Sequence, residues 1–188
     1  MTDRHPRRHR VGLRICSTSV LLLLLAGCGG PYNDLARDFT AQGEPTGVEI
    51  DAARVVMVSR KHRGAYTFGG LRVFLSESAV ELRPRSTYLG LLKKLRLPAD
   101  GVSGCSMTCF GGKDRHADLV FGPQEAEVSF DASSEIVDWC WQNELPMLSG
   151  AQERGWLYEG RSLPSKADYE PVTRDEYEQQ ANRTCMGY

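Results

Sequence analysis

The sequence predicts an α+β fold, a small antiparallel β-sheet or barrel of about seven strands packed by one amphipathic helix. Short apolar runs recur between residues 48 and 130 and are separated by turn-forming residues. A segment that starts at Ser133 has helical periodicity instead. The composition, 41% hydrophobic and 25% charged residues, is ordinary for a globular protein. It excludes a disordered chain, a fibrous repeat and a polytopic membrane protein.

Residues 1–27 have the organisation of an export signal. They hold five arginines and one acid, followed by the apolar run Val20–Leu25 and then by small residues. The run is too short to span a bilayer, which takes about 20 apolar residues. We therefore expect a signal peptide over 1–27. The remaining residues 28–188 carry 18 Lys and Arg against 23 Asp and Glu.

The end of this signal, Leu25-Ala26-Gly27-Cys28, resembles the lipobox of bacterial prolipoproteins. The resemblance implies cleavage before Cys28, a diacylglycerol on its sulfur and an acyl chain on its new amine, so that membrane lipid is a partner. Two or more acyl chains hold a protein stably at a bilayer, whereas one is marginal. Gly29, where Asp would signal inner-membrane retention, implies the outer membrane and the periplasm of a Gram-negative cell. The alternative is an ordinary secretory signal that happens to precede a cysteine.

Residues 28–47 are rich in turn formers and predict a flexible tether behind the lipidated cysteine. Leu35 and Phe39 are four residues apart, a spacing that allows one helical turn within the tether.

Residues 48–145 predict the β-rich globular domain. In Glu125–Phe130, Ala126, Val128 and Phe130 are expected to face the core, and the polar residues between them to face solvent. Leu71–Leu75 and Ala79–Arg83 form a predicted hairpin. The predicted strands are Arg54–Ser59, Leu71–Leu75, Ala79–Arg83, Leu95–Leu97, Val102–Phe110, Ala117–Phe121 and Glu125–Phe130.

The helix is expected from about 133 to 145, ending before Pro146, with Ile136, Val137 and Cys140 on its apolar face. The C-terminal extension, 146–188, is predicted to be irregular because glycines and prolines punctuate it. A capping-box pattern at Thr173 predicts a short helix there, about 174–183.

This order of elements over residues 48–145, several strands followed by one helix, resembles pleckstrin-homology-like domains. The resemblance implies that the helix closes one end of a bent sheet or barrel. An unclassified α+β sandwich is the alternative, and neither fold by itself implies a function.

Four cysteines remain after Cys16 leaves with the signal and Cys28 is lipidated. An even number in an oxidising compartment predicts two disulfides, with three possible pairings. The candidates are Cys105, Cys109, Cys140 and Cys185. A zinc site that adds His116 to three of them is disfavoured by spacing and compartment.

Two further groups of residues are candidates for partner contact. Trp139 and Trp141 flank the apolar face of the predicted helix, so at least one indole should lie at its edge, where it packs on the sheet or faces a partner. Arg60, Lys61 and Arg63 form a basic cluster that suits lipid phosphates or a solvated turn equally.

No dinucleotide, phosphate-loop, zinc-protease or nucleophile-elbow motif occurs, so we expect no catalytic residue, metal or cofactor. The leading hypothesis is a non-catalytic periplasmic binding domain anchored to the outer membrane. Its partner would be an envelope protein or, in an immunity-type role, a toxin. An envelope structural or assembly factor that contacts lipid or an outer-membrane protein is the alternative, and an envelope hydrolase is third. Nucleic acid is not an expected partner, because the exported part is acidic.

Overall fold

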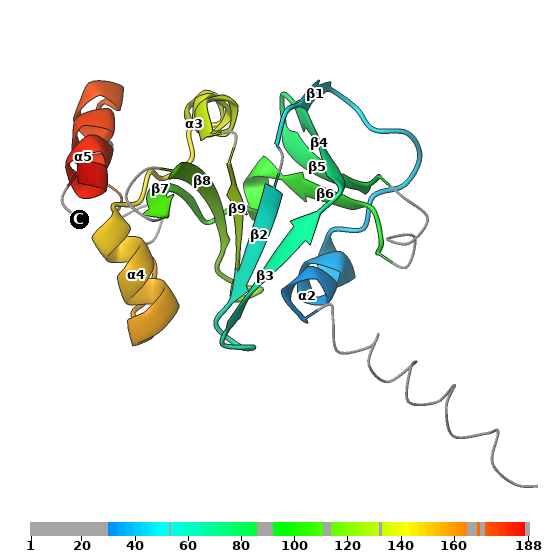
Figure 1. The fold of residues 1–188 in the computed structure, drawn as a ribbon, viewed down its shortest axis with the longest axis horizontal. Coiled ribbons are helices and arrows are strands. Elements are labelled where there is room, and N and C mark those ends of the chain that lie inside the picture. The colour runs from blue at the N-terminus through cyan, green and yellow to red at the C-terminus, as the bar shows by residue number, and fades with distance from the viewer. Residues whose placement is uncertain are drawn as a thin grey trace, which may run out of the picture.

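The computed structural model describes residues 30–52, 54–85, 92–110, 114–131, 133–164, 169 and 172–186. Within these ranges the side chains of residues 110, 114, 133, 180, 181 and 183–186 are not described. The predicted signal peptide and Cys28 lie outside the described residues. Two β-sheets stand next to each other, with helices around their faces and ends (Figure 1).

The first sheet has the strand order β1-β4-β5-β6, with every neighbouring pair antiparallel. The strands β4 and β5 form the predicted hairpin around residues 77 and 78. The strands are β1 (Val48–Ile50), β4 (Leu71–Ser76), β5 (Ala79–Pro84) and β6 (Leu95–Pro98).

The second sheet has the order β3-β2-β9-β8-β7 and is also antiparallel throughout. The predicted α+β class is confirmed, but the described residues form nine strands in two sheets and no closed barrel. The edge strand β3 was not predicted, because its glycine-flanked sequence is half exposed and lacks an apolar run. The strands are β2 (Arg54–Ser59), β3 (Gly64–Gly69), β7 (Gly104–Phe110), β8 (Asp114–Phe121) and β9 (Ala126–Phe130).

Helix α3 (Ser133–Gln142) is the amphipathic helix predicted from the sequence. Its Ile136, Val137 and Cys140 are buried in the main core, which occupies the space between the helix and the strands. Cys140 forms a disulfide with Cys105 of β7, which confirms one of the two expected bridges and ties α3 to the second sheet.

The stretch predicted to be a tether differs from that expectation, because residues 30–38 form helix α2 (Gly30–Asp38). Its Pro31 stands in the first turn, where its missing N–H leaves no hydrogen bond unmade. Tyr32 and Leu35 are fully buried, and the Tyr32 hydroxyl donates a hydrogen bond to the carbonyl of Lys93 at 2.5 Å. The chain therefore joins the core at Tyr32, four residues after Cys28.

The C-terminal extension contains two helices rather than one. Helix α4 (Gly150–Glu159) was not predicted, whereas α5 (Arg174–Met186) is the expected capped helix, longer than predicted. Ser149 and Gln152 form a capping box at the start of α4, and Gly160, with a φ of 72°, ends it. A short 3₁₀ turn, η2 (Ala99–Gly101), follows β6. None of the helices formed by the described residues is long and apolar enough to cross a bilayer.

Candidate functional site

The face of the second sheet that α4 covers, here called the outer face, carries polar side chains in the middle of the sheet. The strand register aligns Ser106, Asp118 and Ser129 in one row across β7, β8 and β9. The next row aligns Val120 with Glu127 and Val58. Side chains directly opposite each other on neighbouring strands share a face, and so do residues two positions apart on one strand. Asp118 shares its face with Val120, and Val120 lies opposite Glu127, so Asp118 and Glu127 lie on the same side of the sheet.

Helix α4 brings a third acid to these two. Asp118, Glu127 and Glu153 are at most 3% exposed, and each offers a carboxylate oxygen within 4.8 Å of the others. We call them the carboxylate cluster. The predicted alternation of β9 placed Glu127 and Ser129 toward solvent, and this is wrong, because both are buried and Glu153 of α4 lies against Glu127.

Hydroxyl groups surround one member of the carboxylate cluster. Thr108 donates a hydrogen bond to Asp118 Oδ2 at 2.7 Å, and Ser106 donates to the same oxygen at 3.5 Å. Ser129 donates to Asp118 Oδ1. Both oxygens of Asp118 therefore accept hydrogen bonds, whereas Glu127 Oε2 and Glu153 Oε2 have no hydrogen-bond partner among the described residues.

Burial dominates the electrostatics of the cluster. It raises the pKa of Asp118 to about 8, with a further contribution from the negative charge of Glu153 that the three hydroxyl donors only partly offset. Burial also raises the pKa of Glu127 well above its usual range, and the charges of Asp118 and Glu153 act in the same direction. The pKa of Glu153 is raised by burial as well. Three acids in so small a volume cannot all stay ionised without a compensating positive charge.

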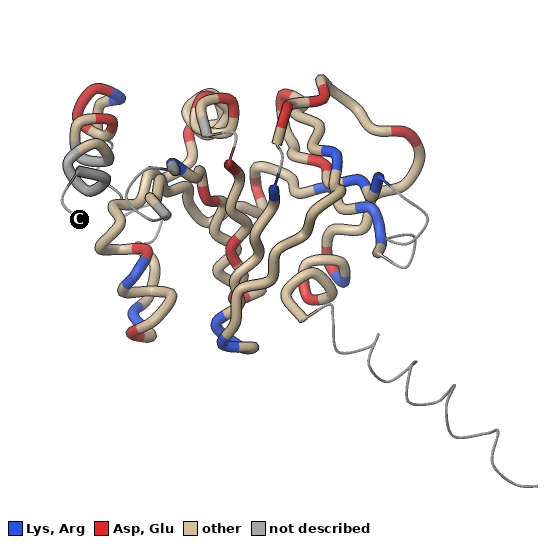
Figure 2. The backbone as a smooth tube through the Cα atoms, viewed as in Figure 1, with Lys and Arg blue, Asp and Glu red and all other residues tan. Residues whose placement is uncertain are grey.

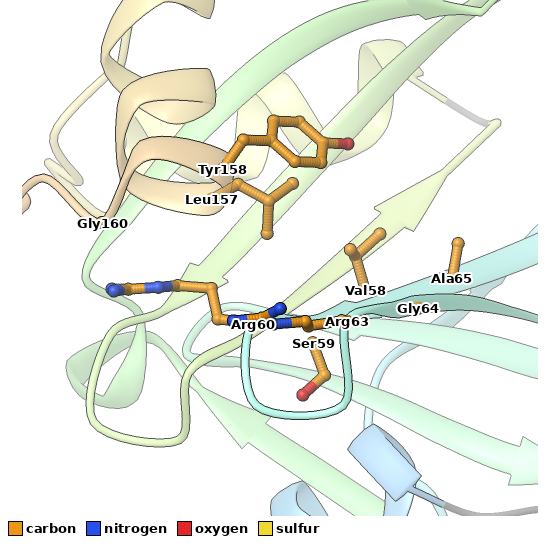
Figure 3. Close-up of a pocket in the computed structure, with 9 residues that line it drawn as sticks. All are labelled: Val58, Ser59, Arg60, Arg63, Gly64, Ala65, Leu157, Tyr158 and Gly160. Atoms are coloured by element: carbon orange, nitrogen blue, oxygen red, sulfur yellow. The ribbon is translucent and has the colours of Figure 1, made fainter.

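A groove of about 650 Å³ opens beside the cluster, between the C-terminal half of α4 and the β2–β3 hairpin. Leu157 and Tyr158 project from α4 over the strands, and Val58 rises from β2 below them (Figure 3). Tyr158 is 74% exposed, and partial desolvation together with the nearby charges of Glu127 and Glu153 raises the pKa of its hydroxyl.

Positive charge gathers at one end of this groove. Arg60 and Arg63 line it, and neither forms an ion pair with a described acid. In Figure 3 the Arg60 side chain extends toward Gly160, and its guanidinium lies 5.4 Å from the ring centroid of Trp156. Such a cation–π contact holds Arg60 in place while leaving its charge uncompensated.

The turn that carries these arginines, residues 60–63, is here called the basic turn; it lies at the tip of the β2–β3 hairpin (Figure 2). It contacts the start of α2. His62 Nε2 lies 2.8 Å from Asp34 Oδ2, and Lys61 lies 3.8 Å from the other oxygen of Asp34. A Cβ added to Gly30 would lie only 3.2 Å from the His62 ring. The first residue of α2 therefore lies directly against the basic turn.

The other predicted site residues are distributed through the fold. Trp139 is buried and donates a hydrogen bond to the carbonyl of Ser76 at 2.8 Å, so it belongs to the core. Trp141 is half-buried, with its ring 6.2 Å from that of Tyr177 on α5. Cys109 is also disulfide-bonded, and the side chain of Cys185 lies outside the described residues.

No protein-family model matches the chain, and no curated protein matches it in sequence. Two features of the described residues stand out chemically, the carboxylate cluster beneath α4 and the basic turn beside the start of α2. The basic turn is recognisable in the sequence, but the carboxylate cluster is not, because its three acids come from segments that the sequence does not show to be neighbours.

Proposed function

We propose that the chain is a lipid-anchored binding protein of the bacterial envelope, whose basic turn and adjoining groove lie against an anionic membrane surface. The observation that carries this proposal is the contact between Gly30 and His62. Cys28, the expected acylation site, is two residues from Gly30, and two residues span at most about 7 Å. An acylated Cys28 would thus hold the basic turn at the headgroups.

Charge complementarity supports the same orientation. A basic residue close to an anionic bilayer surface contributes about 1 kcal/mol of attraction. The basic turn offers Arg60 and Arg63 without a described acidic partner, next to the apolar groove wall of Leu157 and Val58. An anionic phosphate carried on an apolar body, which is the chemistry of a phospholipid, matches this combination.

The anchor is tested first. Intact mass of the protein extracted from membranes should show loss of residues 1–27 and an added lipid mass on Cys28. Cys28→Ala should remove the lipid mass. Wild-type protein that fractionates as soluble, unmodified chain would refute the anchor and with it the proposed orientation.

The second test asks whether the basic turn lies against the membrane, and it uses the mature lipoprotein reconstituted into vesicles. We expect amide hydrogen exchange of residues 60–65 to be slower on vesicles containing phosphatidylglycerol than on pure phosphatidylcholine. The difference should shrink at high salt, because screening weakens attraction between exposed charges. It should also be reduced in Arg60→Gln with Arg63→Asn; Asn suits position 63 because Arg63 has a φ of 45°.

Arg54→Gln is the matched control. Arg54 is exposed and belongs to the same hairpin, but it begins β2 at the end away from the basic turn. Its replacement should leave the exchange difference unchanged. Equal exchange of residues 60–65 on the two kinds of vesicle, in a protein whose lipid mass is confirmed, would refute the membrane-facing surface while leaving the anchor intact.

A further inference from the structure

We propose that Asp118, Glu127 and Glu153 form a binding site for a hard divalent cation, with Ca²⁺ the best-fitting ion. The proposal is independent of the lipid anchor. It rests on the buried geometry of the carboxylate cluster and on the two oxygens in it that lack a hydrogen-bond partner.

The unpartnered oxygens are the observation that points to a ligand. Glu127 Oε2 and Glu153 Oε2 each belong to a side chain that is about 97% buried, and neither accepts a hydrogen bond from a described residue. Glu127 and Glu153 each place a carboxylate oxygen within 4.8 Å of the other and of Asp118, so both carboxyl groups are directed into the cluster. A buried acceptor without a donor is costly, and a cation between these carboxylates would remove that cost.

The negative charge of the carboxylate cluster also favours a divalent cation. Hydrogen bonds from three hydroxyl groups offset part of the cost of burying the Asp118 carboxylate. Glu127 and Glu153 each keep one oxygen without a donor among the described residues, and one divalent cation compensates the charges of both. A single proton shared between these two glutamates would neutralise only one of them.

The ligand set suits Ca²⁺, which tolerates irregular geometry, better than Mg²⁺. Three oxygens no more than 4.8 Å apart can surround one point at about 2.8 Å or less, close to the Ca–O range of about 2.3–2.6 Å. Mg²⁺ requires contacts of about 2.0–2.1 Å in a near-ideal octahedron. The donors are all oxygen atoms, from carboxylates with hydroxyls nearby, which suits hard cations and disfavours thiophilic metals.

The test uses the purified protein, stripped with EDTA and then titrated with Ca²⁺, Mg²⁺ or Mn²⁺. Metal analysis of the re-equilibrated protein should find one equivalent of Ca²⁺. The Tm should rise by about 5 °C or more when Ca²⁺ is present at a hundredfold excess over Kd. Mg²⁺ should give a smaller rise at the same concentration.

Glu127→Gln and Glu153→Gln, singly and together, should abolish the Ca²⁺-dependent rise in Tm. Glu77→Gln, at an exposed turn of the first sheet, is the matched control and should keep it. If a variant fails to fold, metal content and calorimetric titration of the wild type decide the question. Absence of bound metal together with an unchanged Tm in all three cations would refute the site, and protons would then neutralise the cluster.

Discussion

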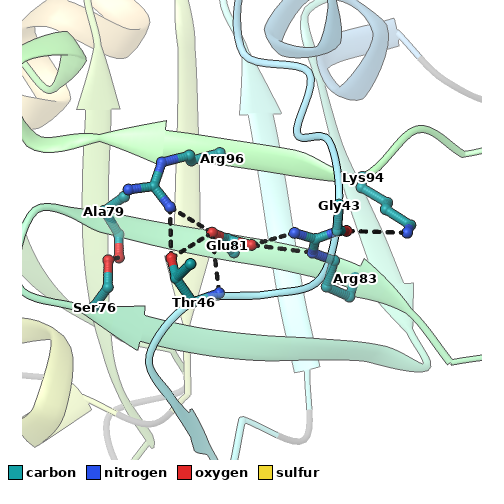
Figure 4. Close-up of polar contacts among 8 residues, drawn as sticks. All are labelled: Gly43, Thr46, Ser76, Ala79, Glu81, Arg83, Lys94 and Arg96. Atoms are coloured by element: carbon teal, nitrogen blue, oxygen red, sulfur yellow. Dashed lines mark hydrogen bonds and ion pairs between the residues drawn. The ribbon is translucent and has the colours of Figure 1, made fainter.

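Glu81 of β5 stands at the centre of a buried polar network whose energetic weight can be predicted from its contacts (Figure 4). One of its oxygens accepts hydrogen bonds from Arg96 at 2.5 Å and from the Thr46 hydroxyl at 2.9 Å. The other accepts from two nitrogens of Arg83, whose guanidinium also donates to the carbonyl of Gly43 at 2.9 Å. The network thereby fastens the segment after α2 to the first sheet.

Replacing Glu81 with Ala should lower the free energy of unfolding by about 3–5 kcal/mol, because it leaves the charge of Arg83 buried without a partner. The Arg83 side chain is only 7% exposed, so water cannot take over the role of the carboxylate. Arg96→Ala should cost about 1 kcal/mol or less, since its side chain is 40% exposed and solvent screens the pair.

Urea denaturation at pH 7 measures both variants, and the pH dependence gives a second check. Burial raises the pKa of Glu81, but hydrogen bonds from Arg83, Thr46 and Arg96 outweigh it and hold the pKa below its usual range. A carboxyl group whose pKa is lower in the folded state than in the unfolded state stabilises the fold at pH values above the unfolded-state pKa. This stabilisation is lost as the pH falls toward the folded-state pKa. The wild type should therefore lose stability below about pH 4.5, and Glu81→Gln should lose less. Equal, small costs for Glu81→Ala and Arg96→Ala would refute this reasoning.

Three more predictions concern the core and the disulfides. Ile136→Ala on α3 should lower the free energy of unfolding by about 2–5 kcal/mol, because Ile136 is fully buried. Gln142→Ala on the exposed face of α3 should change it by no more than about 0.5 kcal/mol. Equal effects of the two variants in urea denaturation would contradict the packing of α3. Replacing both cysteines of the bridge between β7 and α3 with Ser should cost about 4 kcal/mol in the same assay, because that bridge closes a separation of 35 residues. Non-reducing peptide mapping should join Cys109 to Cys185, and a free thiol at Cys185 would contradict that pairing.

The elements that sequence analysis predicted correctly are those whose pattern is complete within one segment. Helix α3 buries the residues that its 3.6-residue periodicity selects, and the β4–β5 hairpin has the strands and turn that its local sequence indicates. Helix α4 is not predicted from the sequence, because Gly150, Gly155 and Gly160 indicate breaks in a helix. The Ser149–Gln152 capping box is the available signal, and a Cβ at Gly155 would approach Arg161 Cδ to 3.0 Å, a tight contact with an exposed side chain.

The carboxylate cluster could not be predicted from a strand pattern alone. An alternating strand reports which residues share a face, but it does not say whether the polar face meets solvent or another element. Glu127 satisfies the alternation and is nevertheless buried, because a helix 23 residues later in the chain covers it. Only the position of α4 distinguishes an ordinary solvated strand from one side of a polar cluster.

Helix α4 connects the two proposed sites, which yields a prediction that neither makes alone. Glu153 reaches the carboxylate cluster, and Trp156, one turn later, lies beneath the guanidinium of Arg60 at the groove. A cation bound to the cluster should hold α4 to the sheet and, through Trp156, keep Arg60 in position. Removing Ca²⁺ should therefore speed amide exchange in α4 and weaken the protection of residues 60–65 on anionic vesicles. Faster exchange in α4 with unchanged protection of the basic turn would show that the two sites are energetically independent.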